Sequence, residues 1–135
     1  MKNKSKLQKI KQAKSGGNAV PSEWLYLNDQ VVTPRNIADI FVEDVQMEAQ
    51  LWEDAGVVEI ELPGEAKSLD MEITATDFGD EYSNEYLAKN QIQTAFLVTI
   101  VPEDYEVAKV AMKKITTAIG GYFCGDTSDF TPVVK

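Results

Sequence analysis

The fold of this chain is decided by residues 44–75, DVQMEAQLWEDAGVVEIELPGEAKSLDMEITA. Three successive segments of this stretch alternate apolar residues with acidic or other polar ones. The apolar residues are Val45, Met47, Ala49 and Leu51, then Val58, Ile60 and Leu62, then Leu69, Met71, Ile73 and Ala75. A period of two places successive side chains on opposite faces of a sheet. The stretch therefore predicts three strands, each with one buried and one exposed face.

A long helix is the alternative for the first segment, because its residues are good helix formers and Gly56 could end the helix. That helix would place Asp44 and Glu48 within its apolar face. In the strand interpretation, Glu53–Gly56 forms a four-residue hairpin loop. Closing this loop pairs apolar with apolar positions, namely 51 with 58, 49 with 60 and 47 with 62. The agreement of register and pattern favours a three-stranded meander over the helix.

The exposed face of this meander is predicted to be strongly acidic. With the second turn at Pro63–Ser68, two rows run across the strands: Glu48–Glu61–Asp70 and Gln50–Glu59–Glu72. Like charges directly opposite each other destabilise a sheet by up to about 1 kcal/mol per pair. The charge could guard the sheet against stacking, or it could dock a basic partner. Under the second interpretation the partner-binding residues are Glu48, Glu59, Glu61, Asp70 and Glu72.

Other elements follow on both sides of the meander. Residues 23–27 predict a short aromatic strand, and Thr33–Pro34 predicts the start of a helix with Ile37, Ile40 and Phe41 on its apolar face. Residues 77–90 are an acidic connector with a possible short helix at 83–88. Residues 92–101 suit a central strand, and residues 122–124 a last short strand before a tail or edge.

Residues 103–119 predict the best helix of the chain, which Gly120 and Gly121 end. Its expected buried stripe consists of Val107, Val110, Ala111, Ile115 and Ala118. The fold class is therefore α+β with an antiparallel sheet, in the order strand, helix, four strands, helix. This order is similar to the TATA-binding-protein-like arrangement, with a ferredoxin-like arrangement as the alternative. The likeness concerns topology and implies no function.

Charge divides the chain into two parts. Residues 1–17 contain no acid and six lysines: Lys2, Lys4, Lys6, Lys9, Lys11 and Lys14. Residues 18–135 contain the other seven basic residues and all 22 acidic ones, a formal charge of −15. We interpret residues 1–17 as a flexible basic arm and residues 18–135 as a single acidic domain. Such an arm can contact nucleic acid, an anionic membrane or an acidic protein surface.

Composition argues against several kinds of chemistry. The chain has no His, the commonest general base, and its single cysteine excludes an internal disulfide framework. Cys124 follows the last helix and is expected to be an ordinary packing residue. The oxygen-rich cluster around Asp77, Asp80 and Asn84 lacks the spacing of a helix-loop-helix calcium site. We expect no metal, no cofactor and no catalytic residue, and leave open whether the protein is an enzyme.

The function predicted from these patterns is binding of a basic protein partner by a non-catalytic, cytoplasmic domain. The charge and size resemble those of immunity proteins against basic nuclease toxins and of acidic secretion chaperones. One alternative is a small-molecule-binding or carboxylate-based enzyme domain. Another is a nucleic-acid or membrane tether that works through the lysine arm. The aromatic residues Trp24, Tyr26 and Trp52 could form a binding surface, but strand aromatics usually belong to the core.

Overall fold

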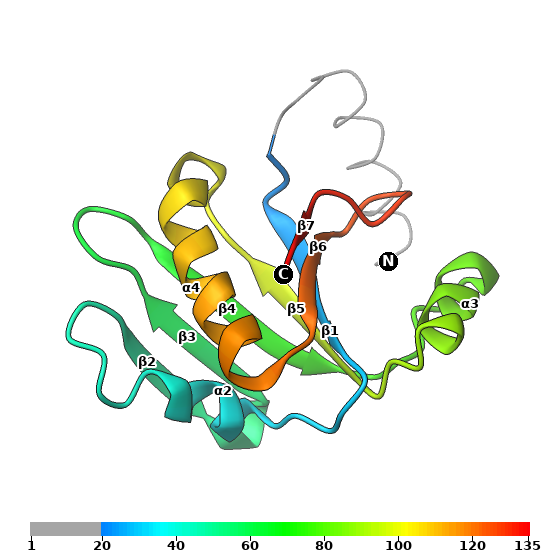
Figure 1. Ribbon diagram of the computed structural model, residues 1–135, viewed down its shortest axis with the longest axis horizontal. Coiled ribbons are helices and arrows are strands. Elements are labelled where there is room, and N and C mark those ends of the chain that lie inside the picture. The colour runs from blue at the N-terminus through cyan, green and yellow to red at the C-terminus, as the bar shows by residue number, and fades with distance from the viewer. Residues whose placement is uncertain (1–19) are drawn as a thin grey trace.

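The computed structural model describes residues 20–135, which form one seven-stranded antiparallel sheet and three α-helices (Figure 1). The lateral order of the strands is β2-β3-β4-β5-β1-β6-β7. The strands are β1 (Glu23–Asn28), β2 (Glu48–Trp52), β3 (Val57–Glu61), β4 (Ser68–Thr74), β5 (Thr94–Thr99), β6 (Tyr122–Gly125) and β7 (Val133–Val134). The helices are α2 (Pro34–Ile40), α3 (Glu81–Lys89) and α4 (Tyr105–Ile119). The predicted α+β class with an antiparallel sheet is confirmed.

Capping residues define the first turns of the two shorter helices. The Thr33 hydroxyl accepts a hydrogen bond from the Asn36 amide at 3.1 Å, and the Asn36 side chain accepts one from the Thr33 amide at 2.9 Å. This reciprocal cap, followed by Pro34, satisfies two amides at the start of α2. At α3, the Asp80 carboxylate accepts from the Ser83 amide at 3.1 Å. The predicted helix start at Thr33–Pro34 is confirmed.

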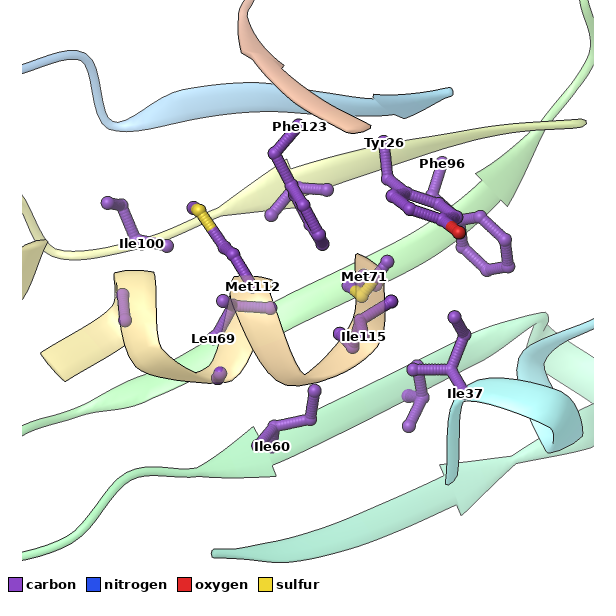
Figure 2. Close-up of a cluster of buried hydrophobic side chains, with 14 of the residues drawn as sticks. Tyr26, Ile37, Ile60, Leu69, Met71, Phe96, Ile100, Met112, Ile115 and Phe123 are labelled. Carbon is purple, nitrogen blue, oxygen red and sulfur yellow. The ribbon is translucent and has the colours of Figure 1, made fainter. Parts of the chain in front are cut away.

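The main core lies between one face of the sheet and the helices α2 and α4, which both cover that face (Figure 1). Figure 2 shows side chains of β1, β3, β4, β5 and β6 directed toward the two helices. The buried set includes Tyr26, Ile60, Leu69, Met71, Phe96 and Phe123 from the sheet and Ile37, Met112 and Ile115 from the helices. Burial of this apolar surface is the main force that holds the helices on the sheet.

A second, smaller core lies on the opposite face of β1, β5 and β6. Leu25, Leu27, Ala95 and Cys124 pack there with Leu87 of α3 and with Phe130 of the loop before β7. The rings of Tyr86 and Phe130 stack with centroids 4.1 Å apart. This cluster anchors α3, which lies at the end of the sheet away from α2 and α4 (Figure 1).

The three-stranded meander is confirmed, and the long-helix alternative for residues 44–54 is wrong. Ala49 pairs with Ile60 and Leu51 with Val58, as the sequence predicts, and residues 53–56 form the loop. The strand begins only at Glu48, however. Val45 lies in the preceding bend with 98 % of its surface exposed, because the chain is still turning out of α2 at that point. Its assignment to the buried set is wrong.

The second hairpin is shifted by two residues from the prediction. Glu61 pairs with Ser68 and Glu59 with Asp70, whereas Glu61 was expected opposite Asp70 and Glu59 opposite Glu72. A shift of two keeps every side chain on its face, so the apolar pattern could not distinguish the registers. In the observed register Ile60 meets Leu69 and Val58 meets Met71, and Leu62 is buried in the turn region instead of pairing.

The apolar stripe of α4 is also rotated from the prediction. Ala108, Ala111, Met112 and Ile115 are buried, whereas Val110 is about half exposed and Ala118 is exposed. Apolar residues occupy more than half of the helix circumference, so spacing alone allowed both stripes. None of the helices formed by residues 20–135 is both long enough and apolar enough to cross a membrane.

Candidate functional site

The face of β2, β3 and β4 that points away from α2 and α4 forms the candidate site, called here the acidic sheet face. Its side chains, taken from the strand registers, are Glu48, Gln50, Trp52, Val57, Glu59, Glu61, Ser68, Asp70 and Glu72. Each of them is exposed or half exposed. All five residues predicted to bind a partner lie on this one face, and none of its nine positions is basic.

The five acids are arranged in rows that differ from the predicted ones. The first row is Glu48–Glu61–Ser68, the second is Gln50–Glu59–Asp70 and the third is Trp52–Val57–Glu72. Two like-charge pairs remain in direct cross-strand contact, Glu48 with Glu61 and Glu59 with Asp70. Glu72 instead has Val57 on one side. The predicted three-acid row Glu48–Glu61–Asp70 is therefore wrong, although the face is as acidic as expected.

Two polar side chains moderate the charge on this face. The Gln50 amide donates to a Glu61 carboxylate oxygen at 3.0 Å. The Ser68 hydroxyl donates to the Asp70 carboxylate at 2.8 Å. Each neutral donor sits beside a carboxylate but leaves the negative charge in place. The face keeps its acidic character without any cation within its own rows.

Ion pairs involve the helices α2 and α4. Arg35 of α2 holds Glu53 through two hydrogen bonds of 2.8 and 2.9 Å, and this contact lowers the pKa of the Glu53 carboxyl. Lys114 of α4 pairs with Asp44 at 3.0 Å. The pKa of Asp44 is lowered mainly because its carboxylate accepts the Gln46 backbone amide, with Lys114 contributing further. These pairs attach α2 and α4 to neighbouring loops, and among residues 20–135 no ion pair joins a cation to a carboxylate of the acidic sheet face.

Trp52 was considered for a binding surface, but the core was the preferred assignment, and for this residue that preference is wrong. Trp24 and Tyr26 are buried in the main core as expected, and the Trp24 ring stacks on Tyr105 at 5.5 Å. Trp52 has 48 % of its surface exposed and shares a face with Glu48 and Gln50. The sequence already indicated this placement, because residues 48, 50 and 52 alternate along one strand and therefore lie on the same face of the sheet. Exposed tryptophans are enriched at protein-binding surfaces.

A shallow groove of about 600 Å³ continues the acidic sheet face beyond the start of β2. It runs between the α2–β2 loop and the β3–β4 turn, and its lining includes Val42, Val45, Glu48, Glu61 and Pro63. Val42 and Val45 are strongly exposed. The groove therefore offers apolar surface next to the Glu48–Glu61 pair.

Other residues considered from the sequence have structural roles. The Asp77 carboxylate accepts from the Gly79 amide and the Asn84 side chain, and these bonds, the Asn84 one foremost, lower its pKa. Cys124 is buried in the second core. Within residues 20–135, no three His, Cys, Asp or Glu residues are grouped so that they could hold a metal ion. The basic arm, residues 1–17, lies outside the described residues.

Tyr26 is a buried residue with a titratable hydroxyl. The Tyr26 hydroxyl donates to the Gly120 carbonyl at 2.6 Å and accepts from the Asn28 side chain at 2.8 Å. Burial raises the pKa of this hydroxyl to about 12. The network ties β1 to the end of α4 and stays neutral, so it stabilises the fold.

Comparisons of the chain with protein-family models, curated proteins and solved structures gave no match.

Proposed function

We propose that the protein is a non-catalytic binding module whose acidic sheet face binds, and thereby neutralises or escorts, a basic protein partner. Its role would be like that of an immunity protein or a secretion chaperone. The observation that carries the proposal is the placement of five acids, one exposed tryptophan and no basic side chain on one face that no other element of residues 20–135 covers. Electrostatic complementarity of this kind speeds association and fixes the orientation of the partner.

The cost of the arrangement supports a functional role. Glu48 faces Glu61 and Glu59 faces Asp70, and each such pair destabilises the sheet by a few tenths to about 1 kcal/mol. A soluble surface could mix signs or use threonine at these positions without this cost. Trp52 adds an aromatic contact area with few rotatable bonds, the kind of residue that carries much of the binding energy at interfaces.

Affinity purification from the native host with paired charge-reversal variants tests the proposal. The test variant is Glu59→Lys/Asp70→Lys, which reverses charge at the centre of the acidic sheet face. The matched control is Glu81→Lys/Glu85→Lys on α3, which changes net charge by the same amount at two exposed positions. We expect a lysine- and arginine-rich protein to be retained by the wild type and the control and lost by the test variant. Retention by all three proteins, or loss from both variants, would contradict the proposal.

We propose the TATA-binding-protein-like arrangement for residues 23–119, with the ferredoxin-like arrangement as the alternative. Support comes from the lateral order β2-β3-β4-β5-β1 with α2 and α4 on one face. The short helix α3 and the strands β6 and β7 are additions to that arrangement. This likeness carries no information about the partner.

A further inference from the structure

The strand β2 is an edge of the sheet, and its outer side is unpaired within the described chain (Figure 1). It pairs with β3 without a bulge over all five residues, so its outer edge is regular. Natural edge strands are often blunted by lysine, proline, a bulge or very short length. The sequence of β2, EAQLW, contains neither lysine nor proline, whereas the opposite edge, β7, is only two residues long.

The two faces of β2 specify what could pair with it. Glu48, Gln50 and Trp52 point to the acidic sheet face, whereas Ala49 and Leu51 are half buried and pack against the main core. Side chains of an added strand would lie directly beside these residues, about 5 Å away. The position beside Glu48 therefore favours a basic residue, and the positions beside Ala49 and Leu51 favour apolar residues.

From this pattern we propose that the basic partner binds as an extended segment added to the edge of β2, with basic and apolar residues in alternation. This inference rests on the proposed function and specifies how its surface is used. Backbone hydrogen bonds to β2 supply affinity, and the alternating side chains supply specificity. The basic residues lie over the acidic sheet face, and the apolar residues extend the core beside α2.

Charge favours a segment of another protein over a second copy of this chain as the strand added to β2. An antiparallel pair of two β2 strands centred on Gln50 would place Glu48 of each copy opposite Trp52 of the other, so neither carboxylate would gain a basic neighbour. Each copy also carries a formal charge of −9, so approach of two copies is repulsive at low salt.

The test uses the full-length protein and a fluorescein-labelled octapeptide of alternating lysine and valine. A block peptide with four lysines followed by four valines has the same composition but cannot place the two types on opposite faces. We expect the alternating peptide to bind at least tenfold more tightly in fluorescence anisotropy. We also expect it to slow hydrogen exchange of β2 amides at least tenfold, because the outer amides gain partners.

A pair of variants separates edge binding from binding flat on the face. Glu48→Gln removes a charge from β2, and Glu72→Gln removes one from β4, two strands away and in a different cross-strand row. Edge binding predicts at least a fivefold loss of affinity for Glu48→Gln and a smaller loss for Glu72→Gln. Equal losses, unchanged β2 exchange, or equal binding of the block peptide would overturn strand addition and leave the proposed function standing. If neither peptide binds at low salt, both strand addition and the proposed function are overturned.

Discussion

The strands β2, β3 and β4 have one face that is buried beneath helices and one face that is exposed. Ile60 is fully buried beneath the helices, whereas its neighbour Glu59 points to the acidic sheet face and meets Asp70. On the covered face, residue type is dictated by packing, and a large change there unfolds the protein. On the open face, packing demands little, so the five acids and Trp52 are free to serve recognition. Experiments that change one face at a time can test this division.

The largest effect is expected at the covered face. Ile60→Asp places a carboxylate in the apolar main core between β3 and the helices. An unpaired buried charge costs about 3–5 kcal/mol, a large part of the stability of a small domain. Urea unfolding followed by circular dichroism measures the change in free energy of unfolding.

Glu59→Gln is the matched control on the adjacent residue. It relieves the repulsion between Glu59 and Asp70, so we expect unchanged stability or a gain of up to about 1 kcal/mol. A substantial loss of stability in this variant would contradict the assignment of Glu59 to an open, like-charged face.

The two tryptophans give the next comparison. Trp24 is 1 % exposed and its indole donates to the Pro21 carbonyl at 2.7 Å, so Trp24→Ala should cost about 3–5 kcal/mol. Trp52→Ala should cost less than about 1 kcal/mol and reduce partner binding several-fold. Thermal unfolding together with anisotropy on the alternating peptide measures both quantities. Similar stability losses for the two variants would remove the distinction between a core and a surface tryptophan.

A smaller effect on stability is expected at Asp44, which pairs with Lys114 of α4. The pKa of Asp44 is lowered in the folded state, so the ionised carboxylate stabilises the fold. This contribution is complete above the pKa of the unfolded chain, about 3.9, and is lost as the pH falls through the lower folded value. We expect Asp44→Ala to be less stable than the wild type at pH 7. The difference should shrink toward pH 2, and urea midpoints at several pH values measure it.

The smallest effect is expected from the basic arm. The row that contains Glu59 and Asp70 continues through Thr99 to Glu23, close to where the described chain begins. We therefore predict that residues 1–17 make weak, salt-sensitive contacts with the acidic sheet face and that a basic partner displaces them. Deletion of residues 1–17 should strengthen peptide binding modestly and shift amide resonances of β2–β4 at low salt. Unmoved resonances would make the arm independent of this face.

Local sequence was sufficient for the features that neighbouring residues determine. Thr33 and Pro34 define the start of α2 because the capping partners lie within three residues. The loop Glu53–Gly56 defines the first hairpin because its length and the period of two allow one register that joins apolar pairs. The acidic composition of the open face follows from the same alternation.

Tertiary structure decided between arrangements that the local sequence patterns allow equally. The second hairpin could shift by two residues without moving any side chain to the other face, and α4 could present either of two apolar stripes. Packing of β4 on β5 and of α4 on the sheet selected one arrangement in each case. Trp52 and Val45 are exposed because the helices α2 and α4 cover only one face and the chain enters β2 at Glu48. The sequence by itself determined the class of the fold and the sign of its surface. Only the assembled sheet decided which charges are neighbours, because that depends on contacts between residues far apart in the chain.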